Sequence, residues 1–236
     1  MERYTKHINF SSIGVEGQKK LIRARVLIIG AGGLGTNFAS HFARAGVGEI
    51  FVIDKDKVEL GNLQRQWLYD EQDIGEYKAK AAVVRLRKIN SEIKIDYSIA
   101  EFNSDNAKQL TKGFDLVIDA TDNFKTRLII NDVCKNHGIP WIFTGILGAE
   151  GQTMLIVPGL TKDLRDVLNY NGEFNSGNFN ELEPNIKSSV LAPSVSIMSS
   201  MAVILSFKLL LGEYEDSVNR LFVFDTWKNK LKTLNI

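Results

Sequence analysis

The segment from Glu59 to Trp67, ELGNLQRQW, gathers amide and cationic side chains into one short stretch. Asn62, Gln64 and Arg65 can each donate hydrogen bonds to phosphate oxygens, and the guanidinium does so with a positive charge. The segment follows a strand that is typical of a nucleotide-binding fold. A dehydrogenase has no evident need for these groups there, whereas an enzyme that handles a triphosphate does. The segment therefore indicates a site for a nucleoside triphosphate.

A glycine-rich turn precedes this segment and could hold the phosphates. Residues 30–35, GAGGLG, match G-x-G-x-x-G between a predicted strand and a predicted helix. Gly30 allows a tight turn, and Gly32 and Gly33 let backbone N–H groups approach an anion at the helix N-terminus. Asp54 ends the next strand, where a carboxylate can accept hydrogen bonds from ribose hydroxyls. The pattern favours nucleotide binding over a purely structural turn, but alone it does not distinguish ATP from NAD.

The elements that position these residues alternate between strand and helix over about 24–145, which is typical of a parallel sheet covered by helices. We predict one Rossmann-like, doubly wound α/β domain over 1–236, with a mainly parallel sheet. A polar loop over about 159–187 interrupts the alternation. An antiparallel extension, residues 190–236, is expected to follow it. The expected strands are 24–30, 49–54, 93–99, 114–120, 140–151, 152–158, 220–227 and 230–236, and the expected helices are 31–46, 76–89, 104–111, 123–138 and 190–211.

Taken together, the motifs resemble the ThiF/MoeB family, which is related to ubiquitin-activating enzymes. The resemblance extends over about residues 3–212 and is carried by RVLIIGAGGLG, IDKDKVELGNLQRQ, IGEYKAKAA, DLVIDATDN and LAPSV. It implies an ATP-dependent adenylyltransferase that joins AMP to the C-terminal carboxylate of a small ubiquitin-like sulfur carrier and releases pyrophosphate. The segment 159–187 matches the position of the family's crossover loop, which covers the tail of the carrier.

The resemblance also implies roles for single residues. Arg65 and Lys78 would hold the phosphates, and Asp122 would hold Mg²⁺. These three would supply positive charge for a reaction that depends on positioning and electrostatics. Taken singly, the two cations could equally be surface charges, and Asp122 could cap the following helix. The residues implied to bind ATP are Gly30, Gly32, Gly33, Asp54, Asn62, Gln64, Arg65, Lys78, Asp122, Asn123 and, from a second subunit of a homodimer, Lys6.

Three departures from the family pattern change the expectations. The sequence has one cysteine, Cys134, so the family's four-cysteine zinc site is not expected. Asn185 lies near the position where several members carry a reactive cysteine, and Cys134 is expected to pack in the core. The enzyme is therefore expected to stop at the acyl-adenylate or to pass it directly to another nucleophile. Lys6 replaces the N-terminal arginine of the family, which keeps the charge but loses the guanidinium fork.

Several alternatives remain open from the sequence. The same adenylation chemistry could act on a ribosomal peptide or another acyl substrate. A NAD-dependent oxidoreductase would use the same turn and Asp54 but would not require the phosphate-binding set. A third alternative is an inactive scaffold that binds a nucleotide and a ubiquitin-like partner.

The overall composition narrows the possible partners and the compartment. The net charge of +1 gives no indication of a nucleic-acid or membrane-surface partner. Residues 190–211 are about as long as a bilayer span, but their five serines, Pro193 and Lys208 favour a buried or interface helix. The N-terminal residues are polar, and we expect a cytoplasmic protein.

Overall fold

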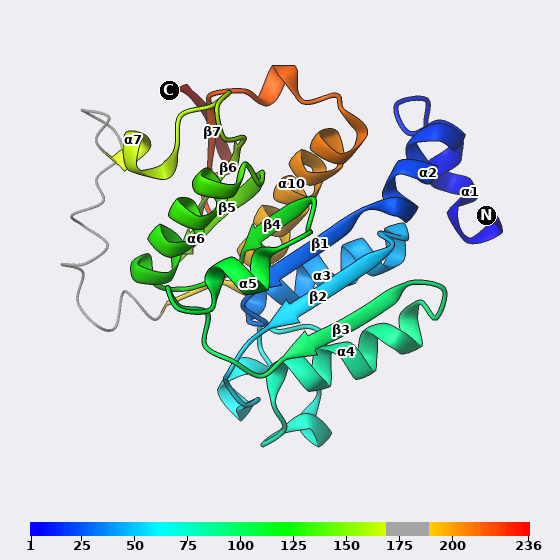
Figure 1. The fold of residues 1–236 in the computed structure, drawn as a ribbon. Helices are drawn as coiled ribbons and strands as arrows, with labels where there is room; N and C mark the ends of the chain where they lie inside the picture. Colours follow the sequence, from blue (N-terminus) through cyan, green and yellow to red (C-terminus); the bar gives the residue numbers. More distant parts are fainter. Residues whose placement is uncertain (169–188) are drawn as a thin grey trace.

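The computed structural model describes residues 1–168 and 189–236, and these residues contain one eight-stranded sheet (Figure 1). The strand order is β3-β2-β1-β4-β5-β6-β7-β8. Pairing is parallel from β3 to β5 and antiparallel from β5 to β8. The strands are β1 (Arg25–Ile29), β2 (Glu49–Ile53), β3 (Lys94–Ser98), β4 (Leu116–Asp119), β5 (Trp141–Leu147), β6 (Glu150–Ile156), β7 (Arg220–Asp225) and β8 (Lys230–Asn235). The predicted doubly wound fold with an antiparallel extension is confirmed.

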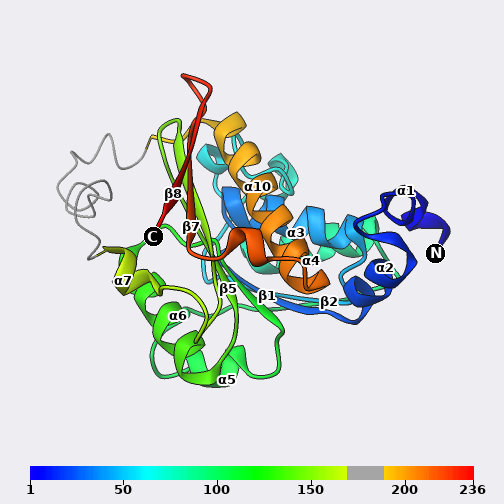
Figure 2. The ribbon, with the colours of Figure 1, turned by 90° about the horizontal axis from the view of Figure 1, so that it is seen from above.

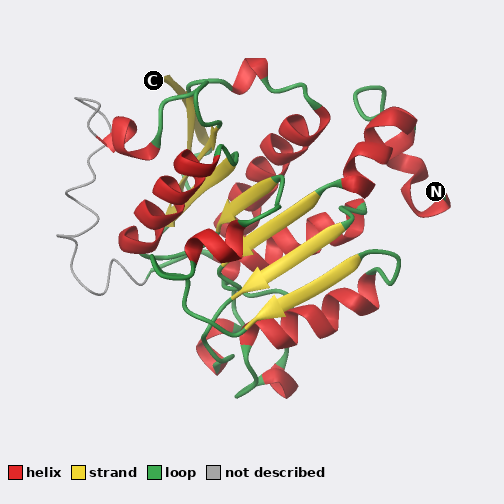
Figure 3. Cartoon of the chain, viewed as in Figure 1, coloured by secondary structure: helices red, strands yellow, loops and turns green. Residues whose placement is uncertain are grey.

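Helices cover both faces of this sheet (Figures 2 and 3). Figure 2 shows α3, α4 and α10 on one side and α5, α6 and α7 on the other. The α-helices are α1 (Thr5–Ile8), α2 (Gly14–Arg23), α3 (Gly33–Ala45), α4 (Lys78–Ile89), α5 (Ala107–Thr111), α6 (Phe124–His137), α7 (Leu164–Leu168) and α10 (Ala192–Leu211). Short 3₁₀ turns are η1 (Glu2–Tyr4), η2 (Leu60–Asn62), η3 (Glu71–Asp73) and η4 (Glu215–Ser217).

The central strand β1 explains why two cores form. Its side chains alternate between the two faces of the sheet, so that Val26 and Ile28 join one apolar cluster and Leu27 and Ile29 join the other. All four side chains are buried. A strand buried on both faces reads as a continuous apolar run, which is the pattern of a central parallel strand.

Helix α10 is long and apolar enough to cross a membrane by length and composition, but half of it is buried inside the structure. It packs against α3, β5 and β6. Val195, Met198 and Ala202 belong to the core on that side of the sheet. These contacts agree with the predicted buried helix. Ile197 and Ile204, in contrast, are exposed.

All five predicted helices begin later than the sequence pattern indicated, and for two of them local contacts explain the shift. Helix α4 begins at Lys78, because Tyr77 pairs with Lys57 in an isolated β-bridge that keeps the preceding backbone extended. Helix α5 begins at Ala107, because the Asn103 side chain accepts hydrogen bonds from the backbone of Asp105 and Asn106 and holds a turn there. The first shift matters for the site, since it places Lys78 at the start of a helix.

The polar segment 159–187 is not entirely loop, which corrects the prediction. Its first part contains the short helix α7, whose Leu164 and Val167 are buried against the second core. Two hydrogen bonds from Arg165 to Asp132 join α7 to α6. The rest of the segment and Asn185 lie outside the described residues. At the other end, β7 and β8 form the predicted terminal hairpin.

Candidate active site

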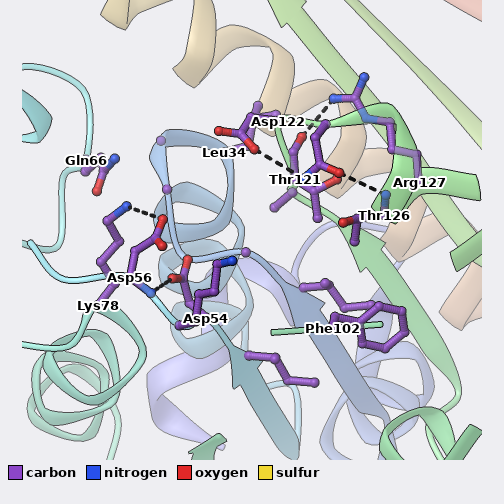
Figure 4. A pocket seen from close by; sticks show the side chains of 18 of the residues that line it. Leu34, Asp54, Asp56, Gln66, Lys78, Phe102, Thr121, Asp122, Thr126 and Arg127 are labelled. Carbon is purple, nitrogen blue, oxygen red and sulfur yellow. Dashed lines mark hydrogen bonds and ion pairs between the residues drawn. The ribbon is translucent and has the colours of Figure 1, made fainter. Parts of the chain in front are cut away.

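A cavity of about 770 Å³ lies at the carboxyl ends of β1, β2 and β4 (Figure 4). Strand order reverses between β1 and β4, and ligands of doubly wound sheets bind in the crevice at such a point. The lining includes most of the residues singled out from the sequence. The sequence-predicted residues that line it are Gly30, Gly32, Gly33, Asp54, Asn62, Arg65, Lys78, Asp122 and Asn123.

Two predicted residues do not reach this cavity. Gln64 is exposed and does not line the cavity. Lys6 lies on α1, which Figure 1 places near the beginning of β1, at the opposite end of the strands from the cavity. A role for Lys6 at a nucleotide therefore requires a second subunit.

The glycine-rich turn fits against its neighbours so closely that side chains are excluded at two positions. Gly30 has φ of +100°, and a Cβ there would lie 2.5 Å from the carbonyl oxygen of Ala120. A Cβ on Gly35 would lie 1.9 Å from the carbonyl oxygen of Gly30. Helix α3 can therefore begin directly at the end of β1. Its N-terminus opens onto the cavity, where the helix dipole and backbone N–H groups favour an anion.

Asp54 fixes the turn as well as facing the cavity. Its Oδ2 accepts a hydrogen bond from the Ala31 N–H at 2.6 Å, and its Oδ1 accepts one from the Asp56 N–H at 2.7 Å. Burial raises the pKa of the Asp54 carboxyl, while these bonds and the charge of Lys78 oppose the rise. Each carboxylate oxygen can accept more than one hydrogen bond, so both can also receive a ribose hydroxyl.

Lys78 is held at the cavity by its place in the chain and by an acidic neighbour. It is the first residue of α4, and its backbone N–H donates to the Asp56 carbonyl at 2.8 Å. Its Nζ lies 3.3 Å from Asp56 Oδ2 (Figure 4). Asp56 follows Asp54 by two residues in the segment IDKDKVELGNLQRQ, a D-x-D pattern, but the sequence analysis assigned no role to Asp56. The structure shows that the second acid of this pattern holds the lysine that faces the cavity.

The segment after β2 supplies three further polar residues to the cavity wall. Asn62 accepts a hydrogen bond from the Glu59 N–H at 3.1 Å, and Arg65 donates from Nη1 to the Gly61 carbonyl at 3.0 Å. Gln66, which the sequence analysis did not select, is 3% exposed. Within the described residues its Oε1 has no hydrogen-bond partner. An unpaired buried acceptor is costly, so the position of Gln66 on the cavity wall fits a role toward a bound ligand.

Asp122 is left free for a ligand because its neighbour caps the following helix. Asn123 is the N-cap of α6 and accepts from the Thr126 N–H at 2.9 Å. The alternative that Asp122 is the cap is therefore wrong. Asp122 is exposed, and its Oδ1 lies 3.5 Å from the Asn123 amide nitrogen.

The single cysteine is not available for chemistry. Cys134 lies on α6 and is 0% exposed within the second core. Burial raises the pKa of its thiol well above the ordinary value. A thiol that stays protonated is a poor nucleophile. The predicted packing role of Cys134 is confirmed.

The sequence pattern of the ThiF family matches residues 4–236. The chain belongs to the ThiF family. Among curated members, it is 39% identical over 233 residues to the sulfur carrier protein ThiS adenylyltransferase of Bacillus subtilis (strain 168), covering 97% of this chain and 66% of that protein. It is 40% identical over 158 residues to the SAMP-activating enzyme E1 of Haloferax volcanii, covering 67% of this chain and 58% of that enzyme. The chain thus spans about two thirds or less of the length of these relatives.

Solved structures with the same fold include two that match almost all of this ThiF-family chain. The crystal structure of E. coli MccB with ATP superimposes with a TM-score of 0.84 at 26% identity, covering 99% of this chain and 71% of MccB. MccB with AMPCPP and MccA gives a TM-score of 0.83 at 25% identity, with the same coverage.

The arrangement of charges in the ThiF-family cavity suits a polyphosphate. Figure 4 shows Lys78 and Asp56 on one wall and Asp122 and Arg127 on another. The glycine-rich turn at the head of α3 lines the cavity together with both walls. Cations, backbone donors and one free carboxylate can together hold a triphosphate with a metal ion.

Proposed function

We propose that this chain is an ATP-dependent adenylyltransferase that activates the C-terminal carboxylate of a small ubiquitin-like sulfur-carrier protein as an acyl-AMP. The observation that carries the proposal is the meeting of the glycine-rich turn, Asp54, Lys78 and Asp122 at one cavity. The relatives named as adenylyltransferases support the choice of reaction. The homologues named for ThiS and SAMP support the choice of carrier.

The proposed reaction needs positioning and charge rather than a general base. A carboxylate oxygen of the carrier attacks the α-phosphorus, the bond between the α-phosphorus and the bridging oxygen breaks, and pyrophosphate leaves. The attacking carboxylate is already ionised at neutral pH, so no proton has to be removed. Arg65 and Lys78 neutralise charge on the phosphates, and Asp54 orients the ribose. Asn62 and Gln66 complete the polar wall.

Mg²⁺ fits the residues that are present. Residues 1–168 and 189–236 contain no group of three or more His, Cys, Asp or Glu side chains that could hold a metal ion. Mg²⁺ is commonly bound by one or two carboxylates together with substrate phosphates, so the exposed Asp122 would be its protein ligand. The ion would supply additional positive charge to the phosphates. With a single, buried cysteine, a family-type zinc site is not proposed for these residues.

The second candidate keeps the chemistry and changes the substrate. The MccB structure with AMPCPP and MccA shares the fold over 99% of this chain. The one thiol of the chain is buried, so the acyl group is not proposed to pass to a cysteine of its own. A peptide substrate would leave the activation step unchanged, and the two candidates differ only in the acyl donor.

ATP with Mg²⁺ is expected to stabilise the protein and NAD is not. A ligand at about 100 times its Kd adds about 2.7 kcal/mol to the free energy of unfolding, which a thermal denaturation curve resolves. Stabilisation by NAD alone would contradict the proposal. ATP–pyrophosphate exchange is then measured with carriers that end in Gly-Gly and with short peptides. Exchange with the carrier supports the first candidate, and exchange with peptides alone supports the second.

We further propose a cytoplasmic homodimer. The exposed apolar residues Ile197 and Ile204 of α10 are candidates for a subunit interface. Lys6 does not line its own cavity, and its proposed partner is the nucleotide of the second subunit. The buried half of α10 supports a soluble protein. Analytical ultracentrifugation is expected to give twice the 26.4 kDa of one chain, and Ile204→Glu is expected to give monomers. A wild-type monomer at micromolar concentration would contradict the dimer.

A further inference from the structure

The loop that carries Asp122 rests on a buried ion pair, between Asp119 and the wall residue Arg127, to which the proposed reaction gives no role. Asp119 is the last residue of β4 and is 0% exposed, and Arg127, one turn into α6, is 7% exposed. Asp119 Oδ2 and Arg127 Nε lie 3.2 Å apart. Neither atom makes a hydrogen bond within the described residues, so their contact is electrostatic. Buried ion pairs are expensive to form, and replacing one with well-packed apolar residues is often neutral or stabilising, so stability alone does not account for the pair.

The pair holds the residue before Asp122 from both sides. Asp119 Oδ1 accepts from the Thr121 N–H at 2.9 Å and from Thr121 Oγ1 at 2.6 Å. Arg127 Nη2 donates to the Thr121 carbonyl at 2.8 Å. The backbone donor, the backbone acceptor and the hydroxyl of Thr121 are therefore all bound by one acid and one base.

The same arginine links this loop to the neighbouring strand. Arg127 Nη2 also lies 3.3 Å from the Thr144 carbonyl of β5. Its guanidinium carbon lies 5.4 Å from the centre of the Phe143 ring and 5.7 Å from that of Phe124. The guanidinium is thus fixed on several sides, and lysine could not reproduce these contacts.

We propose that Asp119 and Arg127 are positioning residues that fix the peptide around Thr121 so that the Asp122 carboxylate is directed at a metal ion on the ATP phosphates. The inference rests on the proposed function. Asn123, on the other side of Asp122, is fixed by capping α6. The backbone is therefore held on both sides of a carboxylate that is itself exposed. Such outer contacts of metal ligands typically contribute about 10–100-fold to metal affinity.

Arg127→Lys tests the proposal without leaving the buried Asp119 uncompensated. The variant keeps the positive charge but loses the bonds to the Thr121 and Thr144 carbonyls. Isothermal titration is carried out with ATP in EDTA and then with ATP at increasing Mg²⁺. We expect the Mg²⁺ concentration that gives half of the full increase in ATP affinity to rise about 10–100-fold. Because lysine keeps a positive charge at the cavity wall, the loss of ATP affinity in EDTA should be much smaller than the loss in Mg²⁺. Arg165→Lys is the matched control, because it alters the ion pair between Arg165 of α7 and Asp132 of α6, and neither residue lines the cavity.

Thr121 provides a second test if the arginine variant does not fold. Thr121→Val removes only the hydroxyl bond to Asp119 and is expected to shift the Mg²⁺ dependence in the same direction by a smaller factor. Thr121→Ser is expected to restore it. The proposal is overturned if Arg127→Lys and Thr121→Val keep the wild-type Mg²⁺ dependence. It is also overturned if the variants lower the affinity for ATP equally in EDTA and in Mg²⁺, which would indicate a general disturbance of the cavity.

These binding measurements need no acyl substrate. A wild-type protein that binds ATP with Mg²⁺ but exchanges pyrophosphate with no carrier or peptide would count against the proposed function. The effect of Arg127→Lys on the Mg²⁺ dependence of ATP binding would still show whether Arg127 positions the Asp122 loop.

Discussion

Replacement of Lys78 with methionine is expected to lower ATP–pyrophosphate exchange by about 10²–10³-fold, the usual effect of removing one positioned group from a site where charge develops. Lys78 is buried at the first turn of α4 and lines the cavity. A cation in such a place acts through a lower effective dielectric than a solvated lysine, so its attraction to a phosphate is stronger. Exchange at saturating ATP and carrier measures the effect.

The fold is expected to tolerate this change. Methionine keeps an unbranched stem of similar length, and Asp56, the partner of Lys78, has a side chain that is 57% exposed. Loss of a partly exposed ion pair costs about 0–1 kcal/mol. Lys80→Met is the matched control, because Lys80 lies on the same helix but forms an exposed pair with Glu76. Equal losses of exchange in the two variants, or full activity in Lys78→Met, would contradict the role of Lys78.

The parts of the site that could be predicted from the sequence depend on local signals. Gly30 and Asp54 stand at the ends of strands whose apolar runs are unmistakable, so the order of elements fixes where they meet. Lys78 could be found because the resemblance to the family is strongest in this part of the chain. Its partner Asp56 lies two residues after Asp54 in the sequence, but only the folded chain shows that Asp56 contacts Lys78.

The parts that could not be predicted depend on contacts between distant segments or on local turn geometry. The turn after η2 decides that Gln66 lines the cavity and Gln64 does not, and two glutamines in NLQRQ look alike in a sequence. Asp122 and Asn123 are adjacent and both are good helix caps, so the sequence alone does not show that Asn123 is the cap of α6. The contact of Arg127 with the Thr144 carbonyl joins α6 to β5, and no periodicity in the sequence indicates it. Helix α7 was missed because five residues give too little periodicity to recognise.

Replacement of Asp122 with asparagine is expected to lower pyrophosphate exchange by at least about 100-fold, because the carboxylate is the only charged protein group proposed to hold Mg²⁺. Asparagine has the same shape and can keep the contact with Asn123, so the thermal stability should change little. Raising Mg²⁺ is expected to restore part of the exchange. Asp105→Asn, at an exposed acid outside the cavity, is the control. Unchanged Mg²⁺ dependence in Asp122→Asn would show that the metal is held elsewhere.

The double variant Asp122→Asn with Arg127→Lys shows whether the two residues act on the same ion. If Arg127 works only by directing Asp122, its replacement should lower pyrophosphate exchange little once the carboxylate is gone. The loss of exchange in the double variant should then be smaller than the product of the two single losses. Independent roles would instead multiply the two losses. The distinction is sharp because Arg127 touches the loop through Thr121 and not through the Asp122 side chain. A buried arginine that positions a metal ligand without contacting it can be recognised only by such coupling.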